Sequence, residues 1–320
     1  MPLVPPLGPG PVVELAVPGA RAVSPVMASH PPLVAVAFAT TDTRGAGVYL
    51  AVSGDNGASF TDPEPVSREE GVDAALADLQ LDIAGAAVAP AQSTASVRVS
   101  WRTRAGHAFS RSVRPWTGRD PAPPSAAPDL HPAPALTCEP SGELRAAVRS
   151  DVDAVSVNHG LAEQQCEAGD AASAADLRGW SHAVWVGHDG AARRLFYAGS
   201  SDGQWFGGAH ALETGSAPSH VALAVDPNQT VVAVWDEAAE GGRHVRLQQV
   251  IPAHHGPATL LPAIRLSVSR GGHPAVVAVD GGVAAAWVDE SSGRLTMRRV
   301  GLDALCAVEP PSATQVVDAR

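Results

Sequence analysis

Residues 219–236 read SHVALAVDPNQTVVAVWD, and residues 273–289 read HPAVVAVDGGVAAAWVD. In both stretches an apolar run rich in Val and Ala ends at an Asp, a short turn follows, and a second apolar run leads to a Trp. Pro-Asn and Gly-Gly between β-branched runs are typical turn residues of β-hairpins. Residues 180–186, WSHAVWV, match the second run more loosely. The sequence therefore predicts a repeated hairpin whose second strand carries a tryptophan.

The spacing of these tryptophans gives the repeat length. Trp185, Trp235 and Trp287 are 50 and 52 residues apart, and Trp101 lies 84 residues before Trp185, which leaves room for a unit built on Glu143–Val148. Phe38 takes the same place at the end of an earlier apolar run. The six marker residues are Phe38, Trp101, Val148, Trp185, Trp235 and Trp287. A period near 50 with several short strands per unit is typical of β-propellers.

We therefore predict an all-β fold, a six-bladed β-propeller of four-stranded antiparallel blades, in which residues 1–320 form a single domain. Runs of Val and Ala suit strands that are buried on both faces. The N-terminal stretch Val12–Val17 is a spare strand, and we expect it to complete the last blade and close the ring, because closure removes an exposed edge. Residues 1–10 are expected to be irregular, and Arg68–Leu81 is the one helix-like stretch.

Composition excludes several classes of function. The formal net charge is −11, which argues against binding nucleic acid. All 22 basic residues are Arg, so Schiff-base chemistry on lysine is excluded. No run of 18 apolar residues predicts a transmembrane segment, and Met1–Gly10 lacks the features of a signal peptide. Of the three cysteines, Cys138 and Cys166 could pair and leave Cys306 free, or all three could be buried thiols.

One motif is more specific than the repeat. Residues 53–60 read SGDNGASF, a Ser-x-Asp-x-Gly-x-Ser-Phe pattern that resembles the Asp-box, or BNR repeat, of sialidase-like β-propellers. Residues 200–206, SSDGQWF, are a degenerate copy that contains Asp202. The resemblance implies that Ser53, Asp55, Gly57 and Phe60 build a tight turn on the face opposite the functional one. It also implies an extracytoplasmic protein, periplasmic or secreted.

The same resemblance implies three substrate-binding arginines, a tyrosine nucleophile and an aspartate acid/base, and the sequence departs from that pattern. The usual Phe/Tyr-Arg-Ile-Pro start is absent, and Tyr49 and Tyr197 both lie inside third-strand patterns. We therefore predict a non-catalytic exported propeller that binds a protein, glycan or small molecule at the mouth of its channel. The alternative is a glycoside hydrolase that uses loop carboxylates. The candidate carboxylates follow the tryptophan strands, where they could also be solvated turn residues: Asp236, Glu237, Asp289 and Glu290.

Three histidines occupy similar places at the start of an innermost strand. His131, His220 and His273 each precede an apolar run, so we expect them to meet at the channel mouth. Three imidazoles can bind Cu or Zn, with Met27 and His30 adding to the site. Alternatively, they are polar strand-start residues that bond backbone or water. Two carboxylates about 5–9 Å apart would favour the hydrolase, whereas converging histidines without such a pair would favour metal or ligand binding.

Overall fold

The structure is a computed structural model, and it describes β-strands, turns and short connections along most of the chain. The described residues are 10–41, 47–67, 77–84, 95–102, 107–115, 125–126, 136–138, 144–149, 154–157, 166–189, 191–201, 206, 209–252 and 258–302.

The described strands form six antiparallel sheets, four of which have four strands. The sheets, in chain order, are β2 (Ala22–His30), β3 (Leu33–Thr40), β4 (Gly47–Ser53) and β5 (Glu64–Ser67); β6 (Ala77–Ala84), β7 (Ser96–Arg102), β8 (Ala108–Val113) and β9 (Ser125–Ala126); β10 (Leu136–Cys138), β11 (Leu144–Arg149) and β12 (Ala154–Val157); β13 (Cys166–Ala175), β14 (Ser181–Asp189), β15 (Ala192–Ser200) and β16 (His210–Ala211); β17 (Ser216–Val225), β18 (Val231–Ala239), β19 (Gly242–Ile251), β20 (Thr259–Leu260) and β21 (Ile264–Arg265); and β22 (Gly271–Val279), β23 (Gly282–Asp289) and β24 (Leu295–Gly301) with β1 (Val12–Leu15). The prediction of an all-β chain built from four-stranded antiparallel sheets is confirmed.

Each of the six marker residues lies on the second strand of a different sheet. These strands are β3, β7, β11, β14, β18 and β23. In three sheets the marker stacks on an aromatic residue directly opposite it on the third strand, with ring centroids 5.8–5.9 Å apart. Cross-strand aromatic pairs of this kind stabilise a sheet. The repeat read from the sequence is therefore a repeat of structure.

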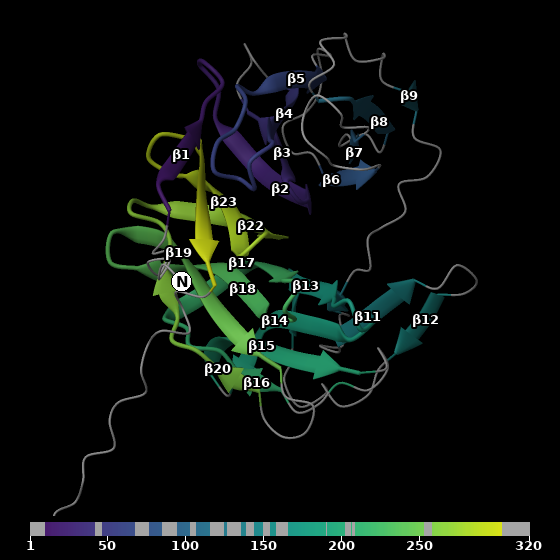
Figure 1. The fold of residues 1–320 in the computed structure, drawn as a ribbon. Helices are drawn as coiled ribbons and strands as arrows, with labels where there is room; N and C mark the ends of the chain where they lie inside the picture. Colours follow the sequence, from purple (N-terminus) through teal and green to yellow (C-terminus); the bar gives the residue numbers. More distant parts are fainter. Residues whose placement is uncertain are drawn as a thin grey trace, which may run out of the picture.

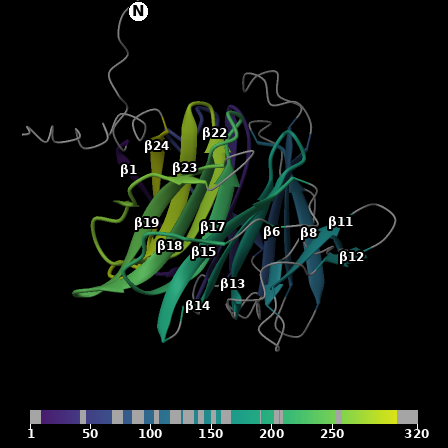
Figure 2. The same ribbon diagram turned by 90° about the horizontal axis from the view of Figure 1, so that it is seen from below.

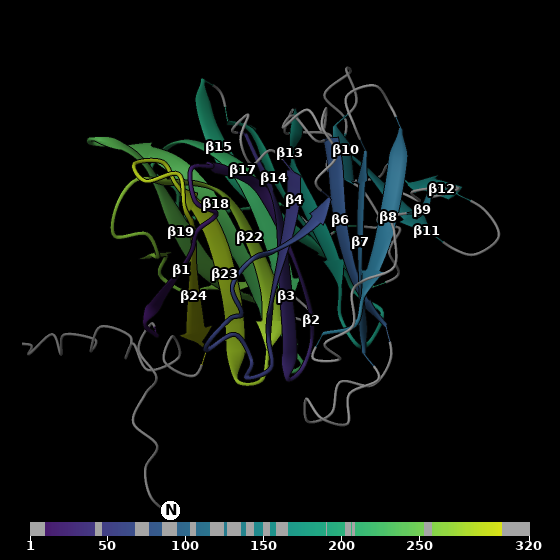
Figure 3. The same cartoon turned by 90° about the horizontal axis from the view of Figure 1, so that it is seen from above.

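The core lies between the sheets, because both faces of the central strands are apolar. Trp235 packs in a cluster with Val184, Val186 and Leu195 of the preceding sheet, and Trp287 packs in a cluster with Val234 and other residues of β17–β19. The first strands of successive sheets are in contact: β6 with β2, β2 with β22, β22 with β17, β17 with β13, and β13 with β10. Figures 1 and 3 show the sheets face to face, with these first strands nearest one another.

The N-terminal strand joins the last sheet, as predicted. β1 pairs antiparallel with β24 from Val12 opposite Arg298 to Leu15 opposite Leu295, and Figure 2 shows the two strands side by side. The prediction of a helix-like stretch over residues 68–81 is wrong in the part that the structure describes, because residues 77–81 belong to strand β6. Its apolar residues pack in a sheet, where Leu79 is buried against the neighbouring sheet of β2–β5.

The Asp-box forms a closed turn between β4 and β5. Asp55 accepts hydrogen bonds from Ser53 Oγ at 2.6 Å, from Ser59 N at 2.9 Å and from Ser59 Oγ at 2.6 Å, and Ser53 Oγ accepts from Gly57 N at 2.8 Å. Gly57 has a φ of +80°, and a Cβ there would lie 3.2 Å from Ala284 of the last sheet. Phe60 packs beneath the turn in two apolar clusters. Asp202 lies outside the described residues.

Replacing Asp55 by alanine removes the acceptor of three of these bonds. The carboxylate is exposed, so we expect the free energy of unfolding to fall by only about 1 kcal/mol. Urea denaturation measures the change, and Asp62→Ala, an exposed aspartate just beyond the turn, is the matched control. Equal stabilities of the two variants would contradict a structural role for Asp55.

Other expectations fall partly outside the described residues. Cys138 and Cys166 lie on β10 and β13, but their side chains and Cys306 are not among the described parts of the chain. Within the described ranges, no helix is long and apolar enough to cross a membrane.

Candidate functional site

Three innermost strands carry the same irregularity near their start. The antiparallel register shifts between Val23 and Val26 in β2, between Ser219 and Ala222 in β17, and between Gly272 and Ala275 in β22. Inside each bulge a residue other than glycine has a left-handed backbone: Ser24 (φ 48°), His220 (φ 48°) and His273 (φ 53°). Such bulges redirect side chains and are common next to active sites. We call the end of the molecule that carries these three residues the bulge face.

The bulge face lies opposite the Asp-box. Asn56 N, in the Asp-box turn, donates to Pro32 O in the turn where β2 ends and β3 begins. Ser24 lies near the other end of β2. The placement that the resemblance implied for the Asp-box, away from the histidines, agrees with this geometry.

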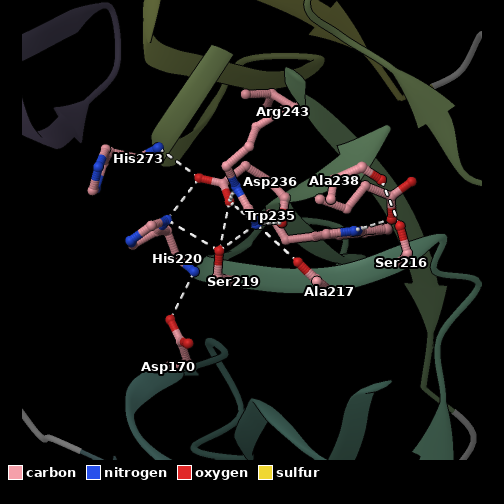
Figure 4. A network of polar contacts seen from close by, with 12 residues as sticks. Asp170, Ser216, Ala217, Ser219, His220, Trp235, Asp236, Ala238, Arg243 and His273 are labelled. Carbon is pink, nitrogen blue, oxygen red and sulfur yellow. Dashed lines mark hydrogen bonds and ion pairs between the residues drawn. The ribbon is translucent and has the colours of Figure 1, made fainter. Parts of the chain in front are cut away.

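At two bulges the backbone N–H donates to an aspartate of the preceding sheet. His220 N donates to Oδ1 of Asp170 on β13 at 2.7 Å, and His273 N donates to Oδ2 of Asp236 on β18 at 2.8 Å. Asp170 is held in turn by Arg193 Nη2 at 2.7 Å. The two left-handed histidines are therefore fixed by buried or half-buried carboxylates, as Figure 4 shows.

Asp236 is the centre of this network, and its side chain is fully buried. Its Oδ2 contacts His220 Nδ1 at 2.8 Å, while its Oδ1 accepts from Ser219 Oγ at 2.7 Å and from Arg243 Nε at 2.6 Å. Burial alone would raise the pKa of Asp236, but the hydrogen bonds from His220, Ser219 and His273 and the charge of His220 outweigh it, so the pKa lies below its ordinary value. Asp236 is therefore an anion at neutral pH.

Arg243 completes the network from β19. Its Nη2 donates to Ala217 O and Asp236 O, both at 2.9 Å, and also contacts Ser219 Oγ. Arg243 thus bonds one carboxylate and two carbonyls through Nε and Nη2, which fixes its side chain within the network.

The rings of His220 and His273 lie against each other, with centroids 3.9 Å apart and planes tilted by 41°. The hydrogen bond to Asp236 raises the pKa of His220, whereas burial and then the charge of His220 lower the pKa of His273. The surroundings therefore favour the protonated form of His220 and the neutral form of His273. Two of the three predicted histidines do converge, and the third, His131, lies outside the described residues.

The described residues do not assemble the predicted metal site. They contain no group of three or more His, Cys, Asp or Glu side chains placed to hold a metal ion. Met27 packs in two apolar clusters near Val36 and Phe60. His30 ends β2 beside the Asp-box turn, at the opposite end from Ser24, because the strand runs from one face to the other. Neither of these two residues lies with His220 and His273.

The four acidic candidates separate into two pairs. Glu237 is buried, bonds Trp235 Nε1 at 2.9 Å and Arg246 at 2.9 Å, and has a packing role. Asp289 accepts the N–H groups of two serines in the turn after β23. Asp236 and Glu290 remain, and both lie at the bulge face.

Gly272 lies between Asp236 and Glu290, where a side chain would be crowded by both carboxylates. A Cβ atom at this glycine would lie 3.3 Å from Asp236 Oδ2 and 3.3 Å from Glu290 Oε1. The two oxygens are therefore no further apart than twice that distance, a range that includes the roughly 5–5.5 Å of retaining glycosidases. The two carboxylates therefore lie close together beside the histidines, with Asp236 buried and Glu290 exposed.

The two tyrosines are elsewhere. Tyr197 is buried and its hydroxyl contacts His182 Nδ1 at 2.9 Å, and burial raises its pKa. Tyr49 stacks on Phe38. Since the sequence has only these two, no tyrosine nucleophile serves the bulge face.

Sequence reasoning missed Asp170, Ser219, Arg193 and Arg243. Asp170 lies in an irregular part of β13 with no apolar alternation, so no pattern singles it out. Ser219 was visible as the residue before His220, and Arg243 follows the Gly-Gly turn of the β18–β19 hairpin. A search for basic residues just after hairpin glycines on the sheet of His220 would have found Arg243.

Comparisons with known proteins show similarity of fold. No known protein family matches the sequence, and no curated protein sequence is similar to it. Among solved structures, a Trypanosoma rangeli sialidase in complex with the inhibitor DANA is 11% identical over 88% of this chain and 55% of its own, with a TM-score of 0.49. An α-L-arabinofuranosidase of Podospora anserina is 11% identical over 91% of this chain and 94% of its own, with a TM-score of 0.40. An endo-arabinase of Bacteroides thetaiotaomicron is 10% identical over 89% of this chain and 96% of its own, with a TM-score of 0.39.

The likeness of these sialidase and arabinanase structures to the chain is one of fold alone. These neighbours are named as glycoside hydrolases, so the predicted non-catalytic binding propeller has no counterpart among them and is not carried further.

Proposed function

We propose that this protein is a glycoside hydrolase whose active site is the bulge face. The observation that carries the proposal is the pair of carboxylates, Asp236 and Glu290, on either side of Gly272. Glycosidases use two carboxyl groups around the scissile bond, and their transition state resembles an oxocarbenium ion. A glycan is then the ligand of the bulge face.

The two carboxylates have different tasks. Glu290 directly follows β23 and is exposed, so it is able to reach a sugar or an attacking water. Asp236 is fully buried and anionic, so it stabilises positive charge on the sugar from beneath without touching it. Each group keeps its place through main-chain contacts, Glu290 N with Arg270 O at 3.1 Å and Asp236 Oδ2 with His273 N at 2.8 Å.

The arrangement of the sheets agrees with such a site. We propose that the six sheets are the blades of one propeller closed by β1, so that the bulges gather where the innermost strands begin. Support comes from the pairing of β1 with β24 and from the contacts between successive first strands. An extracytoplasmic location, which the Asp-box resemblance implies, suits an enzyme that acts on external glycans.

The test is hydrolysis of a panel of p-nitrophenyl glycosides of pentoses, hexoses and sialic acid, together with soluble polysaccharides. We expect at least one substrate to be cleaved, and Glu290→Gln to lower kcat/KM by about 100-fold or more because a catalytic carboxylate is lost. Glu240→Gln, at the exposed turn between β18 and β19, is the control and should retain full activity. A folded wild-type protein that cleaves nothing in the panel overturns the proposal, and so does an active protein in which Glu290→Gln changes nothing.

A further inference from the structure

Three independent contacts fix the position of His220. Its backbone N–H bonds Asp170, its Nδ1 bonds Asp236, and its ring lies against His273 at a centroid distance of 3.9 Å. These partners come from three different sheets: β13, β18 and β22. A side chain held in this way has one orientation, which is what a positioned acid or base requires.

The other ring nitrogen of His220 points to the open side of the network. The side chain is 41% exposed, whereas that of Asp236 is fully buried. Among the described residues, none makes a hydrogen bond to Nε2 of His220. Asp236 therefore has no direct contact with a substrate, and Nε2 of His220 is the atom of this dyad that is able to bond a ligand.

The groups that contact His220 favour its protonated form. The hydrogen bond that His220 donates to Asp236 is the largest influence and raises the pKa of His220. The charges of Asp236 and Asp170 raise it further, while burial and the charge of Arg243 oppose it. The titratable and charged groups of the surrounding elements are Asp170 on β13, Arg193 on β15, Asp236 on β18, Arg243 on β19, His273 on β22 and Glu290 after β23. Of the two stacked imidazoles, His220 is therefore the one whose protonated form the surroundings favour.

We infer that His220 is the proton donor of the hydrolase and that Asp236 and Asp170 are its positioning residues. This inference rests on the proposed function. Nε2–H of His220 protonates the glycosidic oxygen as the bond from that oxygen to the anomeric carbon breaks. Water then adds its hydroxyl to the anomeric carbon and its proton passes to Glu290, and solvent returns one proton from Glu290 to His220. One water is consumed, and each of the two products carries one new hydroxyl group.

The dyad acts like the His–Asp part of a catalytic triad, in which the buried aspartate fixes the tautomer of the histidine. The carboxylate accepts from Nδ1–H, and the second proton of the imidazolium stays on Nε2. Replacing the aspartate by asparagine disturbs that tautomer while keeping the shape. An aspartate with only a structural role would leave the basic limb of the pH profile unchanged on this substitution.

The experiment combines kinetics with nitrogen-15 NMR of the imidazole rings in wild type, His220→Gln, Asp236→Asn and the control His244→Gln. We expect His220→Gln to lower kcat/KM by about 100-fold and to remove the basic limb of its pH profile. Asp236→Asn should move that limb to lower pH, since the charge that raises the pKa of His220 is gone. His244, whose Nδ1 contacts Ser269 O at the periphery, should give wild-type behaviour.

The NMR arm needs no activity. In wild type we expect a proton on Nδ1 of His220 whose resonance is shifted downfield by Asp236 and lost in Asp236→Asn. Absence of that proton, or an unchanged basic limb in an active His220→Gln, overturns the role of His220 while the glycosidase itself stands. A wild type that cleaves no glycoside overturns the proposed function instead, and the NMR result then decides only whether the dyad exists.

Discussion

Replacing Trp235 by alanine is expected to lower the free energy of unfolding by about 4 kcal/mol. Trp235 is fully buried and fills the layer between its own sheet and the sheet of β13–β16. Its Nε1 donates to Glu237, which is itself buried and also bonds Arg246 and Gly215 N. The substitution therefore leaves a large cavity between two sheets and removes one of three partners of a buried carboxylate. Urea denaturation measures the loss.

A matched pair of conservative variants separates packing from hydrogen bonding. Trp185 is the equivalent residue of the preceding sheet, but within the described residues its Nε1 has no hydrogen-bond partner. Trp235→Phe should therefore destabilise more than Trp185→Phe, by about 1 kcal/mol. Equal losses in the two phenylalanine variants would show that the bond from Trp235 to Glu237 contributes nothing.

The second large effect is expected at Asp236. Alanine at this position should lower the free energy of unfolding by about 3 kcal/mol near pH 5.5, because Arg243 and His220 lose a fully buried counter-charge. Arg243 and His220 are partly exposed, which keeps the loss at the low end for buried pairs. Denaturation of Asp236→Ala and of Asp280→Ala, an aspartate in the exposed turn between β22 and β23, gives the comparison.

The loss at Asp236 depends on pH in a defined direction. The folded pKa of Asp236 is depressed, so its contribution is present above about pH 3.8 and disappears as the pH falls through the folded value. The folded pKa of His220 is raised, so its contribution is complete below about pH 6.5 and disappears as the pH rises through the folded value. The difference between Asp236→Ala and wild type should therefore be smaller at pH 9 than at pH 5.5. A difference that is the same at both values would contradict the ion pair with His220.

The repeat was predictable because each unit contains the same pattern of apolar residues. Strands that are buried on both faces are rich in Val and Ala. In β18 and β23 one buried ring, Trp235 or Trp287, fills the layer against the neighbouring sheet, so a Trp recurs in the second strand of these units. The pairing of β1 was predictable for a related reason, since Val12–Leu15 was an apolar strand without a partner of its own.

The site was only half predictable. His220 and His273 stood out by position, but the left-handed bulges that turn them toward each other have no sequence pattern of their own. Asp236 and Glu237 are neighbours in a strand and so point to opposite faces, and nothing in the sequence says which face carries the site. Asp170 comes from a different sheet, so only the assembled fold brings it to His220.

The pairing of β1 with β24 has a consequence for how the chain folds. Val12 must find Arg298, and almost the whole described chain lies between them. Closing so long a loop carries a high entropic penalty and a high contact order, both of which slow folding. During synthesis, β1 is made before the other described strands, and it has no pairing partner until β24 is made. The pairing of β1 with β24 is therefore the last to form. Molecules in which it has not yet formed expose two unpaired strand edges, which can pair with another molecule.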